Sequence, residues 1–270
     1  FKWPDKYFRG SWMLGGKQTS YSASSEDDLF SYFGNSIEDY MQFEDNIYIF
    51  RTSGIYVRQY ISRDSRDHPE FPSFGSQFNW NFTLSGTFLG GDEDYFKNEF
   101  EFKLYSKVIE NLVLFQNFKV GVLSPIDIIG ERSVVPPSAR FFMGGTGIPY
   151  GEMLRGYSDN YVGPFGSTRP KGGNMMLKYS LELRYLFSEQ PTMYILLFAD
   201  AGNVWNDHNV VNPFKLRRSL GFGIRAMMPM LGMLGYDMGY GFDPSIEDHL
   251  SGNNSAHGWE YHFIFGLPIY

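Results

Sequence analysis

Apolar and polar residues alternate with a period of two along much of this chain, and this alternation restricts it to β-structure. Four segments show the pattern clearly, namely Gln77–Phe88, Met175–Tyr185, Leu216–Met228 and Gly235–Asp243. Successive side chains of a strand point to opposite faces of a sheet, so each segment would present one apolar face and one polar face. Helical repeats and α/β folds are therefore disfavoured.

About ten segments have the character of strands, and several of them are unusually long. They comprise the four above together with Tyr7–Lys17, Asn46–Arg63, Tyr95–Ser106, Asn111–Leu123, Thr192–Trp205 and Trp259–Tyr270. Strands of soluble sheets typically have ~5–6 residues, whereas a strand that crosses a bilayer needs ~9–11. The lengths favour strands that span a membrane.

The links between these segments differ in length as they do in an outer-membrane β-barrel, with short turns at one end and long loops at the other. The short links are Ser188–Pro191 and Pro229–Leu234, and the long ones are Ser20–Asp45, Ser124–Gly173, Asn206–Lys215 and Pro244–Gly258. Two links depart from this rule. Arg63–Gly75 is longer than expected and Gly90–Asp94 is shorter.

A water-soluble β-sandwich is the main alternative, because its core would also need one apolar face per strand. The polar faces favour the barrel, since they combine small residues with spaced charges of both signs, as a crowded lumen would. A bundle of transmembrane helices is excluded by the mean hydropathy of -0.30 and by the lack of any apolar run of ~18 residues. The expected fold class is all-β, a transmembrane antiparallel β-barrel.

Composition and motifs also exclude several kinds of function. The chain has no Cys, so it has no disulfide framework, zinc–thiolate site or catalytic thiol. A net charge of -7 argues against nucleic acid as the main partner. The five His show no metal-ligand spacing, and neither a nucleophile elbow nor a phosphate-binding loop is present. The acidic runs Glu26–Asp28 and Asp92–Asp94 could bind Ca²⁺ weakly, but such runs are usually solvated loops. We expect no catalytic residues, no metal and no cofactor.

The link Ser124–Gly173 far exceeds the ~12–15 residues usual for a connection without structure of its own. It is rich in aromatic residues and glycines and poor in charge, which disfavours disorder. The sequence therefore predicts an ordered insertion that carries the function of the protein.

An ordered series of motifs begins in this link and continues through the strands that follow it. The series is Arg140-Phe-Phe-x-Gly-Gly145, Leu154-Arg-Gly-Tyr157, Val162-Gly-Pro164, Gly172-Gly173, Ser180-Leu-Glu-Leu183, Phe198-Ala-Asp-Ala-Gly-Asn-Val-Trp205 and Gly221-Phe-Gly-Ile-Arg225. It resembles the C-terminal barrel of the BamA family of outer-membrane assembly factors, whose superfamily includes TamA and FhaC. Upstream, the segment Arg63–Gly75 is similar to the strand-to-turn segment of that family. The resemblance covers nearly the whole chain.

The resemblance implies a particular domain organisation. Barrels of this family have sixteen strands, so residues 1–270 would form the C-terminal part of the barrel domain with about ten of them. The first strands and the periplasmic domains would then lie upstream of this chain. The link 124–173 would be a long re-entrant extracellular loop inserted into the lumen.

The resemblance also implies which residues of this loop matter. Its motif residues are Gly144, Gly145, Leu154, Arg155, Gly156 and Tyr157. The arginine of the family pairs with acidic residues on nearby strands, which correspond to Glu182 and Asp200. A guanidinium inside a lumen needs carboxylate partners, and its planar fork can bind two of them.

The two acidic residues differ in how far the sequence places them. Alternation independently puts Glu182 on a polar face. Asp200 rests on the resemblance alone, because Met193–Ala199 is apolar on both faces. For an isolated motif, a solvated loop arginine would be the simpler interpretation of Arg155.

The last strand has features of a seam. Phe263 and Phe265 continue an alternation of aromatic residues, and Tyr270 ends the chain on another, which resembles the C-terminal signal of barrel proteins. Gly266 and Pro268 interrupt the strand, and a proline cannot donate a ladder hydrogen bond. In the family, the last strand meets the first at a weakly paired seam, the proposed lateral gate. A frayed terminus is an equally simple interpretation of Pro268.

By resemblance, the chain would be a non-enzymatic factor that folds and inserts client β-barrel proteins into the outer membrane of a Gram-negative cell. Its partners would be outer-membrane lipid, unfolded client barrels and accessory assembly lipoproteins, with no nucleic acid. Two alternatives remain open at this point. One is a TamA- or FhaC-like translocator, and the other is a passive outer-membrane pore.

Overall fold

The fold is taken from a computed structural model of the chain. It describes residues 5–33, 35–126, 133–148, 150–166, 169–207, 209, 211–228, 231–252 and 254–266.

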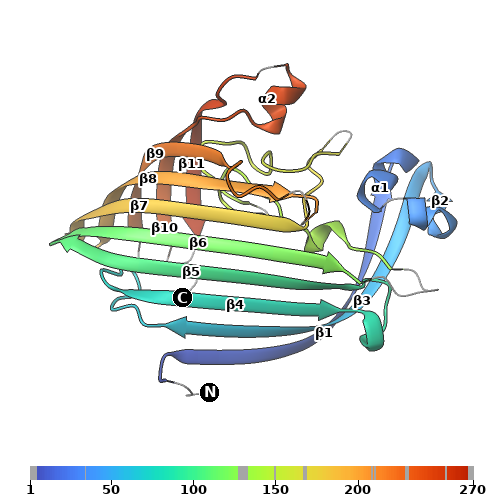
Figure 1. The fold of residues 1–270 in the computed structure, drawn as a ribbon, viewed down its shortest axis with the longest axis horizontal. Coiled ribbons are helices and arrows are strands. Elements are labelled where there is room, and N and C mark those ends of the chain that lie inside the picture. Colours follow the sequence, from blue (N-terminus) through green and yellow to red (C-terminus); the bar gives the residue numbers. More distant parts are fainter. Residues whose placement is uncertain are drawn as a thin grey trace.

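A single antiparallel sheet of 11 strands makes up most of the molecule (Figure 1). Its strands are β1 (Phe8–Ala23), β2 (Gln42–Glu44), β3 (Ile47–Asp64), β4 (Gly75–Ser85), β5 (Tyr95–Ile109), β6 (Leu112–Pro125), β7 (Met175–Glu189), β8 (Thr192–Trp205), β9 (Arg217–Met228), β10 (Gly232–Gly241) and β11 (Gly258–Gly266). Neighbours along the chain are neighbours in the sheet from β1 through β3 to β11, and β2 pairs with β3 off this path. The predicted all-β class is confirmed.

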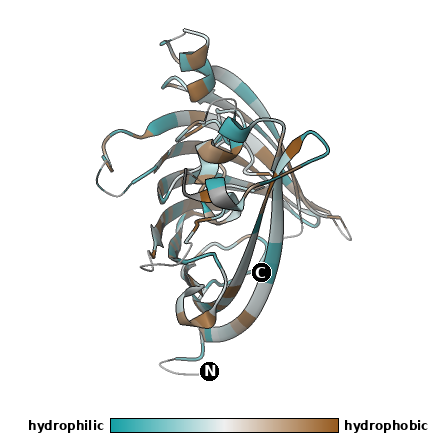
Figure 2. Ribbon diagram, turned by 90° about the vertical axis from the view of Figure 1, so that its right-hand side faces the viewer, coloured by the Kyte–Doolittle hydropathy of each residue, from teal (hydrophilic) through white to brown (hydrophobic). Residues whose placement is uncertain are grey.

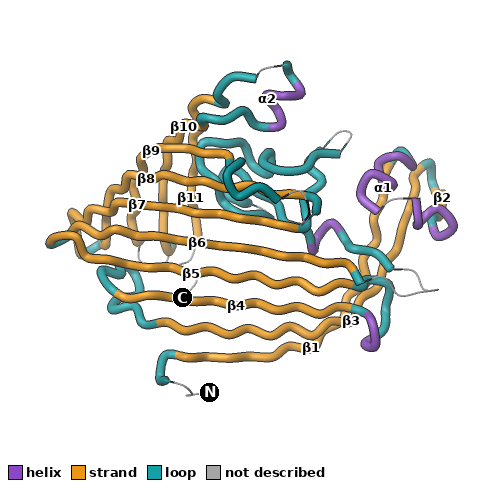
Figure 3. Tube along the Cα trace, viewed as in Figure 1, coloured by secondary structure: helices purple, strands orange, loops and turns teal. Residues whose placement is uncertain are grey.

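Each of the ten predicted strands is present at least in part. The strand predicted over Gln77–Phe88 ends at Ser85, because Thr87–Leu89 form a 3₁₀ helix, and residues 267–270 of the last predicted strand lie outside the described residues. β2 was not predicted, and β1 continues beyond Lys17 to Ala23 because those residues form a ladder with β3. Short helices also occur in the links, namely α1 (Glu26–Phe33), η1 (Asn35–Tyr40), η2 (Thr87–Leu89), η3 (Pro137–Ala139) and α2 (Ile246–Leu250) (Figure 3). No helix in the described part of the chain is both long and apolar enough to cross a bilayer.

The links alternate in length as predicted. Two-residue turns join β5 to β6 and β7 to β8, whereas the links at the opposite ends of the strands include 24–46, 126–174 and 242–257. The two exceptional links are explained by their own packing. In 65–74, Phe71 is buried against Tyr194 of β8 with 5.1 Å between ring centroids.

The other exceptional link, 86–94, folds against β1 and β3. Glu93 pairs with Lys17 at 2.7 Å and accepts a hydrogen bond from Thr52 at 2.8 Å. Glu93 and Asp94 are 0% and 1% exposed. The interpretation of Asp92–Asp94 as a solvated acidic run was therefore wrong. No cluster of metal-ligating residues occurs among the residues that the structure describes.

Hydrophobic and hydrophilic positions alternate along the strands of the sheet (Figure 2). In contrast to a water-soluble protein, the polar side chains are buried on one face and the large apolar side chains are exposed on the other. Polar side chains are buried on the inner face, among them Gln77, Thr83, Asn117, Lys178, Ser180, Glu182, Asp200, Ser219, Arg225, Asp237 and His262. Large apolar side chains are exposed on the outer face, among them Phe102, Phe118, Leu183, Ile195, Leu197, Leu220, Phe222, Ile224, Tyr261 and Phe263. An outer face of this kind suits lipid, and the β-sandwich alternative is wrong.

The link between β6 and β7 is an ordered loop that packs on the inner face of the sheet. Its residues Phe141, Met143, Leu154, Tyr157 and Val162 share one buried cluster with residues of the wall (Tyr95, Leu123, Met176 and Val204). Bridges inside the loop join Met143 to Val162 and Gly145 to Leu154. The loop thus brings the sequence around Arg155 against the polar face of β7 to β11.

Candidate functional site

The glycine pair of the loop motif sets the path of the chain before Arg155. Gly145 has a φ of 54°, and a Cβ at this position would lie 1.9 Å from Oδ1 of Asp159. That oxygen accepts a hydrogen bond from the backbone N–H of Thr146 at 2.7 Å, so the carboxylate of Asp159 occupies the space that a side chain would need. Gly144 has a φ of 133°, again outside the usual range for other residues. These glycines allow the hairpin that carries Leu154 and Arg155 inward.

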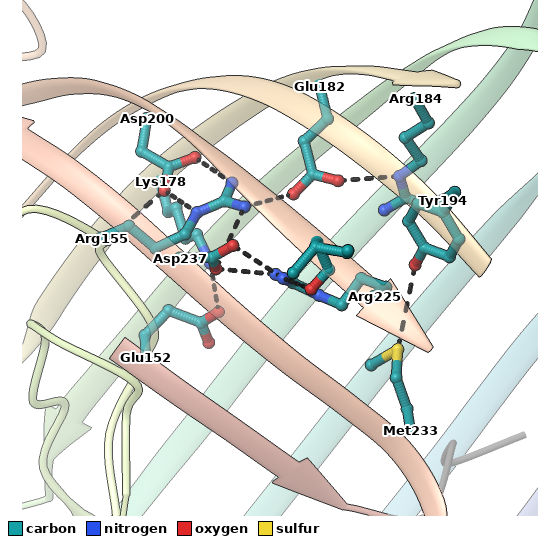
Figure 4. Close-up of polar contacts among 11 residues, drawn as sticks. Glu152, Arg155, Lys178, Glu182, Arg184, Tyr194, Asp200, Arg225, Met233 and Asp237 are labelled. Carbon is teal, nitrogen blue, oxygen red and sulfur yellow. Dashed lines mark hydrogen bonds and ion pairs between the residues drawn. The ribbon is translucent and has the colours of Figure 1, made fainter. Parts of the chain in front are cut away.

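Arg155 lies at the centre of the site and is 1% exposed (Figure 4). Its Nε donates to Oδ2 of Asp200 at 2.7 Å, and its Nη2 donates to Oδ1 of the same carboxylate at 2.8 Å. Its Nη1 forms an ion pair with Oε1 of Glu182 at 2.7 Å and lies 3.8 Å from Oδ2 of Asp237. The structure therefore brings Arg155 together with both acidic residues named from the sequence.

Two more arginines complete an arginine–carboxylate network in which charges of opposite sign alternate. Arg184 donates from Nε to Glu182 at 2.7 Å. Arg225 donates through both terminal nitrogens to Asp237 at 2.7 Å each. Three arginines thus face three carboxylates, and the network extends over β7, β8, β9 and β10 (Figure 4). Such pairing is what allows this many charges to be buried together.

An aromatic ring lies against the guanidinium group of Arg155, and another lies against that of Arg184. The guanidinium of Arg155 lies 3.8 Å from the ring centroid of Phe198, and that of Arg184 lies 3.9 Å from the ring centroid of Phe115. A cation over an aromatic face is stabilised by about 0.5–2 kcal/mol depending on its desolvation. The two rings thus stabilise the guanidinium groups of Arg155 and Arg184.

Gly156 permits a close approach between the loop tip and the wall. Its φ is 81°, and a Cβ there would lie 2.9 Å from Cβ of Ser219 and 3.1 Å from the backbone of Gly241. A side chain at Gly241 would in turn lie 2.4 Å from the carbonyl oxygen of Gly156. Backbone therefore packs directly on backbone at this point. The next residue, Tyr157, donates its hydroxyl to the carbonyl of Arg218 at 2.7 Å.

A second ionic contact holds the loop to β6 and β7. Glu152 accepts from Nζ of Lys178 at 2.9 Å and from Nζ of Lys119 at 2.5 Å. Burial alone would raise the pKa of Glu152, but the two ammonium groups outweigh burial and lower that pKa to about 2. Glu152 therefore carries its charge throughout the physiological range.

The last strand presents its aromatic side chains to the outside. Phe263 and Phe265 are 77% and 65% exposed, whereas His262, which precedes Phe263, is buried at 6%. Gly266 is the final residue of β11 and pairs with Met233 of β10. Pro268 and Tyr270 lie outside the described residues. In the part of the chain that the structure describes, β11 pairs with β10.

Several members of the site were not named from the sequence. They are Glu152, Lys119, Lys178, Arg184, Arg225, Asp237 and His262. A usable signal existed for four of them, because alternation places Lys178, Arg184, Arg225 and Asp237 on the polar faces of their strands. The alternation of Tyr261 and Phe263 also places His262 on the opposite face but does not identify its partner, and the importance of Glu152 depends on the path of the loop.

The chemistry of this arrangement is structural. Each carboxylate of the network is bound to an arginine, which leaves none of them as a general base. The residues that resemble family motifs meet at one place, the inner face of the wall, where the loop tip is bound by side chains of β7 to β11.

The chain is similar to known proteins over most of its length. The model of the Omp85 superfamily domain matches residues 5–267. The chain is 28% identical over 186 residues to the outer membrane protein assembly factor BamA of Nitratidesulfovibrio vulgaris, which covers 68% of this chain and 22% of that protein. It is 26% identical over 151 residues to a SAM50-like protein of Schizosaccharomyces pombe, which covers 54% of this chain and 30% of that protein.

Among solved structures, the crystal structure of BamA from Haemophilus ducreyi lacking POTRA domains 1–3 has a similar fold. The TM-score is 0.70 with 20% identity, over 97% of this chain and 51% of that chain. The described wall is therefore part of a barrel of this type, and the chain spans less than a third of the curated relatives. Because the domain match extends over nearly the whole sequence, the chain belongs to the Omp85 superfamily.

Proposed function

We propose that this chain is the C-terminal barrel part of a factor that folds and inserts β-barrel proteins into an outer membrane. Membership of the Omp85 superfamily supports this proposal, as does a relative named an outer membrane protein assembly factor. The structural observation that carries it is the outer face of the wall, where large apolar side chains suited to lipid are exposed as far as the terminal strand β11.

The proposed mechanism is strand addition at the edge of β11. A strand in lipid must satisfy every backbone N–H and C=O group, because no water is available to do so. When the seam beside β11 opens, its edge would offer such groups to a strand of a client, which would then enter the bilayer already hydrogen-bonded. Neither a nucleotide nor a cofactor is needed, since backbone pairing and apolar burial supply the free energy.

The loop has a supporting role in this proposal. Arg155, Glu182 and Asp200 brace the wall from inside, and Leu154, Gly156 and Tyr157 fix the loop tip against it. Because the loop tip contacts β7 to β11, it keeps the sheet curved up to its terminal strand. The same loop fills space that a passive pore would leave open, which disfavours the pore among the alternatives.

The remaining parts of the proposal concern location and partners. The chain would be an integral protein of an outer membrane, of the Gram-negative type, in contact with its lipid. Client barrels would bind at β11, and accessory lipoproteins would bind elsewhere on the full protein. The first strands and periplasmic domains would lie upstream of residues 1–270.

Photo-crosslinking in the full-length protein tests the edge. A photoreactive residue replaces Phe263 beside the edge, and a matched control replaces Leu197, which is 59% exposed on the outer face of β8 in the middle of the wall. We expect a folding client to be captured from position 263 and not from position 197. Equal capture at both positions, or none at 263, would contradict the proposal. Recovery of the captured substrate beyond the membrane instead of within it would favour a translocator.

A further inference from the structure

One contact joins the loop tip directly to the terminal strand. The backbone N–H of Gly156 donates to Nε2 of His262 at 3.0 Å, and both groups are buried. His262 is the one buried residue of β11 (Gly258–Gly266). Apart from its ladder with β10, β11 is therefore held to the interior mainly through this imidazole.

A neighbouring contact between the loop tip and β11 is more exposed to solvent. The hydroxyl of Ser158 donates to Oε1 of Glu260 at 3.1 Å, and Glu260 is only partly buried. Its carboxylate also accepts from His257 at 3.1 Å. This arrangement leaves His262 as the desolvated link between loop and strand.

The direction of the hydrogen bond fixes the ionisation state of His262. Gly156 can only donate, so Nε2 must carry a free lone pair and the ring must be neutral. In the imidazolium form, an N–H at Nε2 would face the N–H of Gly156. The loop tip cannot turn away from it easily, because Gly156 packs against Ser219 and Gly241.

Charged groups surround His262 on every side. Asp237 lies opposite it on β10, Glu260 lies on its own strand, and Arg155 and Asp159 face it from the loop. Arg225 of β9 neutralises Asp237. Burial and Arg155 disfavour the imidazolium while the ring is bound to the loop tip, and the carboxylates favour it. Once released into water, the ring takes up a proton in mildly acidic solution.

We propose that neutral His262 is a positioning residue that clasps β11 to the loop tip, and that its protonation releases this strand. The inference rests on the proposed function for its meaning, since the released strand is the one that would receive the client. It predicts that the backbone amides of β11 lose protection from hydrogen exchange in mild acid, while those of the other strands keep theirs.

Hydrogen exchange of the full-length protein in phospholipid vesicles tests the clasp without any client. His262→Leu removes the acceptor, whereas His262→Gln keeps an acceptor near the position of Nε2 but cannot ionise. At about pH 8, we expect His262→Leu to speed exchange of the β11 amides roughly tenfold, and His262→Gln to resemble the natural chain. The ladder between β5 and β6 is the internal control and should not change.

Hydrogen exchange at acidic pH distinguishes the hydrogen bond between His262 and Gly156 from ordinary packing of the His262 side chain. At about pH 5.5, after correction for intrinsic exchange, the natural chain should approach His262→Leu while His262→Gln stays protected. An unchanged His262→Leu at both pH values would overturn the inference. An acid response in His262→Gln equal to that of the natural chain would overturn it too, and remains measurable even where His262→Leu fails to fold. Since no client is present, failure here is distinct from failure of the assembly function.

Discussion

Replacing Arg155 with alanine removes the cation at the centre of the network and leaves its carboxylates in place. Arg184 and Arg225 still neutralise Glu182 and Asp237, so the group left without a counter-charge is Asp200. Asp200 loses both bonds of the fork, at 2.7 and 2.8 Å, in a site that is 2% exposed. We expect the docked loop to lose stability, and assembly by the full protein to slow in consequence.

The size of this effect follows from the burial of the pair. Removing one partner of a buried ion pair costs about 3–5 kcal/mol, and the two remaining arginines limit the loss here to the lower half of that range. About 3–4 kcal/mol corresponds to two to three powers of ten in the ratio of docked to undocked loop. Arg155→Lys keeps the charge but loses the fork, so its cost should be about 1–2 kcal/mol.

Hydrogen exchange of residues 150–166 in the vesicle-embedded protein measures this ratio. Arg218→Ala is the matched control, because Arg218 forms a similar fork with Asp243 but its side chain is 65% exposed. That control should cost at most about 1 kcal/mol. Combining Arg155→Ala with Asp200→Asn should cost less than the sum of the two by more than about 1 kcal/mol. The reasoning fails if Arg155→Ala exchanges no faster than Arg218→Ala, or if the two substitutions simply add.

Two other predictions address the second ionic contact and the outer face. Glu152→Gln leaves Lys119 and Lys178 without their counter-charge and should loosen the loop by about 1–3 kcal/mol, seen as faster exchange of peptides that contain Glu152. Because the pKa of Glu152 is lowered to about 2, its contribution is complete above the unfolded pKa and is lost only as the pH falls toward 2, so loss of this contact near pH 5 would contradict the assignment. Leu197→Arg, on the outer face of β8, should cost about 2–4 kcal/mol and slow folding into vesicles if the face meets lipid. The control Phe88→Arg, exposed in the link 86–94, should have little effect, and equal folding of both variants would argue against a lipid-facing wall.

The sequence predicts a strand and its inward face where apolar and polar residues alternate along it, and it predicts less where they do not. The alternation in β4, β7, β9 and β10 was strong enough to give both the strands and the inward face of Glu182. In β8 it failed, because the inward residues Tyr194 and Phe198 are themselves apolar. The structure gives the reason, since Phe198 lies under the guanidinium of Arg155 and Tyr194 packs on Phe71.

Other features had no local signal at all. β2 and η1 form within a link where no periodicity extends over enough residues. The contact between Gly156 and His262 joins residues separated by 106 positions, and it depends on the curvature of the whole wall. Sequence reasoning could place each strand beside its neighbour, but it could not show which inner-face residues the loop would meet.

The residues that bind the loop tip follow one another along the chain, and their order makes docking of the loop depend on the register of the strands. Glu182, Asp200, Asp237 and His262 all follow Arg155, and they come from four different strands. A slip of one residue in the register of β7 or β8 would turn its carboxylate to the opposite face of the sheet. Arg155 would then meet too few counter-charges to remain buried. Docking of the loop therefore succeeds only on a correctly registered wall, which makes it a test of register as well as a brace.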